Sequence, residues 1–156
     1  MKIDRNLPVL ITGATGYVAG WVVKHFLEEG FKVHAAIRDA DNEKKRHHLD
    51  QIANNCDGKI KFFESDLLDE GSYSEAMEGC QIVVHTASPF LLETKDPQRD
   101  LIDPALKGTM NVLNSVNKTV TVTRVVITSS VAAIYGDASD SLDAPNRTLD
   151  ETIWNT

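Results

Sequence analysis

The chain has 156 residues, a formal net charge of −7, 42% hydrophobic residues and 25% charged residues. This length suits one domain with its own core, and the composition is typical of soluble globular proteins. The negative charge argues against a nucleic-acid binder, because the phosphate backbone attracts basic surfaces. Cys56 and Cys80 are the only cysteines, which excludes a disulfide framework and a cysteine-based metal cluster.

We expect no targeting signal at the start of the chain. Residues 1–6 lack the apolar stretch of a signal peptide. No segment approaches the ~20 apolar residues that a membrane-spanning helix needs. The two free thiols fit a reducing compartment. We therefore expect a cytoplasmic protein that binds neither membranes nor nucleic acids.

Short apolar runs alternate with helix-like segments along most of the chain. The runs predict strands over residues 7–12, 32–37, 59–64, 81–86 and 124–128. The segments between them predict helices over residues 18–29, 43–54, 69–77 and 98–117. This alternation indicates an α/β fold with a parallel sheet covered on both faces. We expect a Rossmann-type, doubly wound sheet with strand order 3-2-1-4-5, incomplete on its C-terminal side.

Several residues predict where the helices begin and end. Gly30 and Gly79 stand where C-terminal caps belong, and Asp69 and Asp96 stand where N-caps belong. Pro104 is expected to kink the last helix near its start. That helix carries Ile102, Ala105, Leu106, Thr109, Leu113 and Val116 on one side.

A glycine-rich turn separates the first predicted strand from the first predicted helix. It reads Thr12-Gly13-Ala14-Thr15-Gly16-Tyr17-Val18. Gly13 allows a tight turn, and Gly16 lets the backbone approach a pyrophosphate. The N–H groups of Tyr17 and Val18 then face the phosphates at the helix N-terminus. A merely structural turn is the alternative, but the surrounding strand–turn–helix context favours a dinucleotide site.

The end of the second strand indicates which dinucleotide is bound. NAD-specific folds place an acidic residue there to hold the ribose 2′-hydroxyl. This chain has Arg38 first, and Lys45 follows within a basic stretch of the next helix. Their positive charges favour a 2′-phosphate and hence NADP, although a solvated basic helix face is a simpler explanation for the lysine. Asp39 keeps NAD open as an alternative.

The spacing Thr-Gly-x-x-Gly-x-x-Ala at residues 12–19 resembles the extended short-chain dehydrogenase/reductases. Further matching segments are Ser65-Asp66-Leu67, residues 83–90 (Val-Val-His-Thr-Ala-Ser-Pro-Phe), residues 103–109, residues 126–130 and residues 150–154. Together they resemble the dihydroflavonol reductase and cinnamoyl-CoA reductase branch of the NAD-dependent epimerase/dehydratase superfamily. Epimerases and dehydratases usually have His-x-Ala-Ala where this chain has His-Thr-Ala-Ser.

The resemblance implies roles for residues at the predicted strand ends. Adenine contact falls to Asp66 and Leu67. The remaining cofactor contacts fall to Thr86, Ala87, Ser88 and Thr128. The catalytic serine is Ser130, with Ser129 as the alternative. Simpler explanations stay open: Asp66 could begin a turn, and the serines could hydrogen-bond their own backbone. His85 is expected to be structural, and no metal site is expected.

The resemblance also implies a catalytic Tyr-x-x-x-Lys pair, which this sequence does not contain. The residues four positions after Tyr17, Tyr73 and Tyr135 are Trp21, Met77 and Ser139. We therefore expect the N-terminal half of a longer NADP-dependent reductase of ketones, aldehydes or acyl-CoA carbonyls, inactive by itself. Residues 1–136 are expected to form the NAD(P)-binding domain, and residues 137–156 a surface loop leading toward the missing tyrosine helix.

Two other functions stay open at this point. The chain could be a dinucleotide-binding sensor without a catalytic half, or part of a nucleotide-sugar epimerase or dehydratase. A half-domain would also leave its fifth strand as an exposed sheet edge and deprive the helix over residues 98–117 of a covering partner, and both invite self-association.

Overall fold

The computed structural model describes residues 3–91 and 93–155 of the chain. Its centre is one parallel sheet of five strands in the order β3-β2-β1-β4-β5. The strands are β1 Val9–Thr12, β2 Lys32–Ile37, β3 Lys59–Glu64, β4 Ile82–His85 and β5 Arg124–Ile127. Each strand lies within its predicted range, so the predicted fold class and strand order are confirmed.

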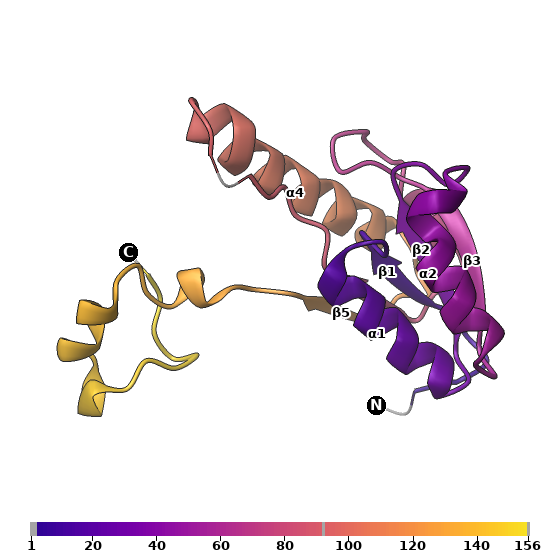
Figure 1. The fold of residues 1–156 in the computed structure, drawn as a ribbon, viewed down its shortest axis with the longest axis horizontal. Helices are drawn as coiled ribbons and strands as arrows, with labels where there is room; N and C mark the ends of the chain where they lie inside the picture. Colours follow the sequence, from indigo (N-terminus) through magenta and orange to yellow (C-terminus); the bar gives the residue numbers. More distant parts are fainter. Residues whose placement is uncertain (1–2, 92, 156) are drawn as a thin grey trace.

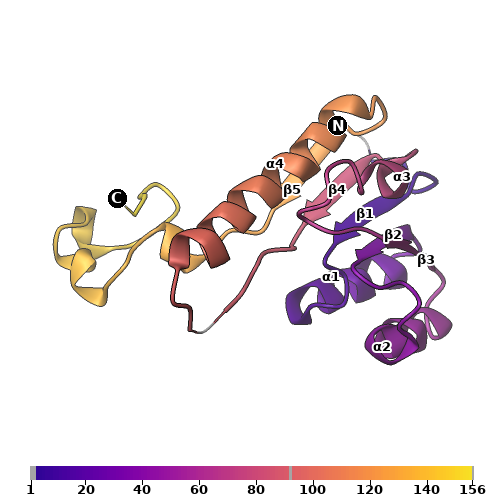
Figure 2. The ribbon, with the colours of Figure 1, turned by 90° about the horizontal axis from the view of Figure 1, so that it is seen from above.

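Helices cover both faces of this sheet. They are α1 Tyr17–Glu28, α2 Glu43–Asn54, α3 Ser74–Met77 and α4 Asp103–Lys118. Helices α1 and α2 lie on one face, and α3 and α4 lie on the other (Figures 1 and 2). Alternate strand residues therefore serve two cores: Ile11 packs with Val23 and Leu27 of α1, whereas Leu10 packs with Met77 and Val112.

The ends of α1 and α3 follow the predicted glycine chemistry. Gly30 has φ +78° and Gly79 has φ +74°, the left-handed backbone that glycine adopts without strain. The N–H of Gly30 donates to the Leu27 carbonyl at 3.0 Å, and the N–H of Phe31 donates to the Phe26 carbonyl at 2.9 Å. These paired bonds close α1 in a Schellman motif. Both predicted caps are confirmed.

The predicted start of α3 is wrong. Asp69 does not cap a helix, because α3 begins only at Ser74, directly after Tyr73. The Asp69 carbonyl instead accepts a hydrogen bond from the buried amide of Asn111 at 2.7 Å. This contact with α4 holds residues 66–72 as a loop, a tertiary effect that outweighs the local capping signal.

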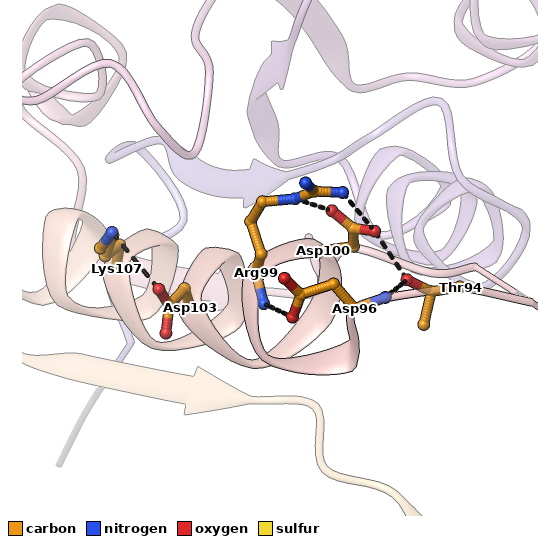
Figure 3. Close-up of polar contacts among 6 residues, drawn as sticks. All are labelled: Thr94, Asp96, Arg99, Asp100, Asp103 and Lys107. Atoms are coloured by element: carbon orange, nitrogen blue, oxygen red, sulfur yellow. Dashed lines mark hydrogen bonds and ion pairs between the residues drawn. The ribbon is translucent and has the colours of Figure 1, made fainter.

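A cluster of polar side chains organises the start of α4 (Figure 3). Asp96 accepts from the N–H of Arg99 at 3.1 Å, which confirms its predicted capping role. The Asp100 carboxylate accepts from Arg99 Nε at 2.6 Å and from the Thr94 hydroxyl at 2.7 Å. These hydrogen bonds, Arg99 first, lower the pKa of Asp100. The cluster thereby anchors the segment that connects β4 to α4.

Pro104 affects the helix as expected, although the distortion lies just before it. Residues Gln98–Ile102 form a π-helical turn that leads into α4. Proline has no N–H to donate to the carbonyl four residues earlier, so the regular α-helical register cannot extend through this point. The wide turn accommodates that missing hydrogen bond.

The side of α4 that packs on the sheet differs from the apolar side that its sequence displays. The buried residues of this helix are Gly108, Asn111, Val112 and Ser115. Leu106 is 61% exposed, although it belongs to the predicted apolar face. A Cβ atom on Gly108 would lie 2.9 Å from the Leu67 side chain, so the small residue lets α4 approach the loop after β3. Close approach and side-chain hydrogen bonds, rather than apolar patterning, orient this helix.

The chain leaves the sheet after β5. Both views show the last segment extending away from the strands and helices (Figures 1 and 2). It contains three short 3₁₀ helices, Val131–Ala133, Ala138–Leu142 and Pro145–Arg147. Strand β5 pairs with β4 only, and its Val126 and Ile127 are exposed. Self-association through this edge stays a prediction. Within the described residues, no helix has the length and apolar character to cross a membrane.

Candidate cofactor-binding site

The carboxyl ends of the five strands form one edge of the sheet. Thr12 at the end of β1 pairs with Ala36 of β2 and with His85 of β4. Ligands of open parallel sheets bind at this edge, beside the point where the strand order reverses. Here that point lies between β1 and β4. The residues that follow the five strand ends are Gly13, Arg38, Ser65, Thr86 and Thr128.

The turn after β1 is held tightly by its neighbours. Gly13 has φ +63°, and the N–H of Gly16 donates to its carbonyl at 2.8 Å. A Cβ atom on Gly13 would lie 3.0 Å from both Cα and Cβ of Ala87. The buried Ala14 donates its N–H to the Ala36 carbonyl at 3.2 Å. The turn is thus fixed between β2 and β4, and Gly13 is required by both its backbone angle and its close contact.

The first turn of α1 has the features of an anion site. Gly16 is its N-cap residue, and no side chain in the described residues caps the helix. Its first turn carries no acidic residue, and Tyr17 is 86% exposed. The leading N–H groups and the positive end of the helix dipole therefore face open space where a phosphate can bind. Thr15, half-buried, completes this turn. The residues present fit a dinucleotide pyrophosphate.

Thr12 has a structural role that its sequence position did not reveal. It is fully buried, and its hydroxyl oxygen accepts from the N–H groups of Thr86 and Ala87, both at 3.1 Å. Its Oγ1 also lies 2.8 Å from Nδ1 of His85. The Thr86 hydroxyl in turn donates a hydrogen bond to the Thr12 carbonyl. These bonds join the ends of β1 and β4, so Thr12 positions the site from within.

The Thr12 hydroxyl also defines the state of His85. Two backbone N–H groups occupy the lone pairs of the hydroxyl oxygen, so its hydrogen is left to donate to Nδ1. The ring therefore carries its proton on Nε2 and is neutral. Burial lowers the pKa of His85, which is consistent with this assignment and with a structural role.

We expect stability to decrease as the pH falls. Burial lowers the pKa of His85 below 6.5, so the unfolded chain takes up a proton that the folded chain does not. Between about pH 7.5 and about pH 5.5, His85 should reduce the free energy of unfolding by about 1 kcal/mol. His34, whose pKa burial also lowers, acts in the same direction. Urea unfolding at several pH values measures this change.

The control for the pH experiment is His85→Asn. The amide oxygen of asparagine can still accept from Thr12, but the side chain does not titrate in this range. The variant should therefore show a shallower decrease in stability with acid. An identical decrease in both proteins would show that His85 does not contribute.

The basic residues near β2 divide into two groups. Arg38 is exposed and forms no ion pair with the residues that the structure describes. Lys45 is also exposed, in the first turn of α2. Arg46 is instead engaged: its Nη1 donates to the Ala40 carbonyl at 2.6 Å, and its guanidinium lies over the Phe62 ring. Arg38 and Lys45 are therefore exposed cations beside this edge, whereas the guanidinium of Arg46 is occupied.

Comparison with known protein families identifies the family of this chain. The model of the NAD dependent epimerase/dehydratase family matches residues 9–153, which span the strands, the glycine turn and the C-terminal segment. The chain belongs to this family. Curated relatives include a cinnamoyl-CoA reductase of Medicago truncatula, 45% identical over 148 residues, which cover 95% of this chain and 44% of the relative. A dihydroflavonol 4-reductase of Solanum lycopersicum is 37% identical over 151 residues, covering 97% and 38%.

Solved structures of reductases have the same fold. The yeast methylglyoxal/isovaleraldehyde reductase complexed with NADPH has a TM-score of 0.77 and 31% identity, covering 96% of this chain and 44% of that one. The vestitone reductase of Medicago sativa has a TM-score of 0.64 and 31% identity, covering 83% and 38%. The resemblance to the reductase branch of the epimerase/dehydratase family is thus confirmed. This chain spans less than half the length of each of these relatives.

The loop after β3 carries Asp66 and Leu67, the two residues expected to contact adenine. Asp66 does begin a turn, because its Oδ1 accepts from the Leu68 N–H at 2.8 Å. Leu67 packs its side chain against α4 at Gly108. Its carbonyl accepts from Asn111 at 3.2 Å. The side chain of Leu67 therefore faces the core, and adenine contact by these two residues stays a prediction.

The residues after β4 and β5 lie at the same edge. Ser88 is exposed, and the Thr128 N–H donates to the His85 carbonyl at 2.9 Å. Ser130 is exposed, and its hydroxyl accepts from the Ala132 N–H at 3.2 Å as the N-cap of a 3₁₀ turn. Ser129 is exposed as well. The local bond leaves the hydroxyl hydrogen of Ser130 free to donate.

Two asparagines support the site and were missed by sequence reasoning. Asn111 of α4 donates to three carbonyls of the loop after β3 and accepts from the Gly71 N–H at 2.9 Å. Asn42 caps α2 by accepting from the Lys45 N–H at 3.2 Å. The signal for Asn42 was its place three residues before Lys45, ahead of a helical pattern. No sequence pattern marked Asn111, and only its tertiary contacts reveal its role.

Proposed function

We propose that this chain binds NADPH as the cofactor-binding part of a reductase that acts on ketone, aldehyde or acyl-CoA carbonyl groups. One observation carries the proposal: the uncapped N-terminus of α1 stands beside a strand end that presents the exposed cation Arg38. An N-terminus of this kind binds a pyrophosphate, and a guanidinium suits a 2′-phosphate. The family, its reductase relatives and the NADPH-bound yeast reductase support it.

Each region of the edge receives a role in this proposal. The turn from Thr12 to Val18 holds the pyrophosphate, while Arg38 and Lys45 hold the 2′-phosphate. Asp66 and the backbone of Leu67 contact adenine. The nicotinamide half contacts the following residues: Thr86, Ala87, Ser88 and Thr128. We further propose that residues 1–136 form the NAD(P)-binding domain of a cytoplasmic enzyme and that residues 137–156 connect it to the substrate region.

Catalysis in this proposal depends on groups that orient and protonate the carbonyl. NADPH supplies the hydride when it is bound. Ser130 donates a hydrogen bond that orients the substrate carbonyl. No tyrosine of the 156 residues is followed by lysine four positions later. The chain by itself is therefore expected to bind NADPH without reducing a substrate.

Calorimetric titration with NADPH, together with an absorbance assay of NADPH oxidation, tests the proposal. We expect saturable binding and no turnover of a panel of aldehydes, ketones and an acyl-CoA thioester. Failure to bind NADPH would contradict the cofactor assignment. Turnover at an ordinary enzymatic rate would contradict the requirement for the tyrosine and lysine.

Arg38→Ala should reduce NADPH affinity about tenfold to about 100-fold and change NADH affinity little, because only NADPH carries the 2′-phosphate. Titrations with both cofactors measure this difference. Arg5→Ala is the control, since Arg5 pairs with Glu29 at the opposite edge of the sheet. If Arg38→Ala reduced the affinity for NADPH and NADH equally, Arg38 would not bind the 2′-phosphate.

A dinucleotide sensor is the second candidate, because the glycine turn and the exposed Arg38 would serve such a protein equally well. Both candidates predict binding without turnover. The coding sequence downstream of residue 156 separates them, because continuation into Tyr-x-x-x-Lys excludes the sensor. Thr86-Ala87-Ser88 after β4 argues against an epimerase or dehydratase, which usually has His-x-Ala-Ala there.

A further inference from the structure

The turn between β2 and α2 links Asp39 to Asn42. Asp39 directly follows the exposed Arg38. The side-chain Nδ2 of Asn42 donates to Oδ2 of Asp39 at 3.3 Å. The backbone N–H of Asn42 also donates to the Asp39 carbonyl at 3.4 Å. Both the backbone and the amide of Asn42 therefore hold Asp39 within the turn.

The orientation of the Asn42 amide follows from the helix. Its Oδ1 accepts from the N–H of Lys45 at 3.2 Å, as an N-cap does. Only the oxygen of an amide can accept this bond, so the NH₂ group must face the other way. The carboxylate of Asp39 lies on that side. The cap of α2 thereby turns an amide donor toward Asp39.

The placement of Asp39 affects which dinucleotide is favoured. A free carboxylate at the end of a second strand accepts from the 2′-hydroxyl of NAD and repels the 2′-phosphate of NADP. We propose that Asn42 is a positioning residue for cofactor choice. Its amide binds the Asp39 carboxylate within the turn and leaves Arg38 as the charge that faces the 2′-phosphate. This inference rests on the proposed NADPH function.

The test measures the ratio of the dissociation constants for NADH and NADPH in the whole 156-residue chain. Asn42→Gly removes the amide donor without changing charge, and glycine at an N-cap costs a helix only a few tenths of a kcal/mol. We expect Asn42→Gly to lower the ratio about three- to tenfold, because Asp39 is released toward the ribose. If the role of Asn42 were purely structural, the substitution would weaken the binding of both cofactors equally and leave the ratio unchanged.

Two further variants complete the test. In Asp39→Asn/Asn42→Gly the ratio should return to the wild-type value, because the released group no longer carries a charge. Asn55→Gly is the matched control, since Asn55 stands at the C-cap of the same helix. It should leave the ratio unchanged. Circular dichroism verifies folding, and Asn42→Ala, which also lacks a side-chain donor, replaces Asn42→Gly if the glycine variant does not fold.

The outcomes separate this inference from the function on which it rests. If the wild-type chain binds neither cofactor, the proposed function is contradicted, and the inference about Asn42 is contradicted as well. Wild-type chain that prefers NADPH, together with an unchanged ratio in Asn42→Gly, overturns the inference alone. A lowered ratio that the Asp39→Asn change does not restore overturns it as well, because the effect would then not pass through Asp39.

Discussion

Replacing Thr12 by valine is expected to lower the free energy of unfolding by about 2–4 kcal/mol, because the N–H groups of Thr86 and Ala87 lose their buried acceptor. Valine has nearly the same shape as threonine, so the loss reports on hydrogen bonds rather than on packing. His85 loses its donor at the same time. Urea unfolding, analysed as a two-state transition, measures the change.

Thr12→Val should also weaken NADPH binding by about tenfold, because the segment after β4 is no longer held beside the glycine turn. Thr12→Ser is the matched control. It keeps the hydroxyl and removes only a methyl group, so it should cost about 1 kcal/mol in stability and little in affinity. Equal effects of valine and serine would show that the hydroxyl does not organise this edge of the sheet.

Gly13→Ala is expected to reduce NADPH affinity by about 100-fold, the largest effect on binding among these variants. At φ +63° a side chain adds about 1–2 kcal/mol of backbone strain. The new Cβ would also lie 3.0 Å from Cα of Ala87, a backbone atom that a simple side-chain rotation cannot move. The turn must then shift away from β4, and the N–H groups of α1 shift with it.

Gly30→Ala is the control for this substitution. Gly30 has φ +78°, yet a Cβ atom there would meet nothing within 4 Å. The variant carries the backbone strain without the clash and without touching the site. It should lower stability by about 1 kcal/mol and leave NADPH affinity unchanged. If both variants reduced affinity equally, general destabilisation rather than the geometry of the turn would explain the loss.

Local chemistry allowed most of the fold to be predicted. Alternating apolar runs and helical segments predicted five ranges that contain the five observed strands, and the order 3-2-1-4-5. The glycines at positions 13, 30 and 79 were placed correctly because tight turns and helix C-caps need a positive φ, which glycine adopts without strain. Arg38 was placed at the sheet edge because it directly follows a strand.

Predictions failed where a distant segment decided the outcome. Asp69 has a capping signal, but Asn111, 42 residues later, binds its carbonyl and keeps the segment out of helix. The apolar side of α4 does not mark its buried face, because Gly108 and Asn111 pack against the loop after β3. Small size and hydrogen bonding outweighed hydrophobic periodicity at this contact.

The sequence by itself determined the fold class, the strand order and the glycine turn at residues 12–16 that leads into α1. These follow from periodicity and glycine chemistry, which act over a few residues. Only the tertiary structure decided the role of Thr12, whose hydroxyl meets partners 73 to 75 residues away. It also decided which face of α4 is buried. Such contacts form only when β1 and β4 become neighbours in the sheet. A local sequence pattern carries no information about partners so far away along the chain.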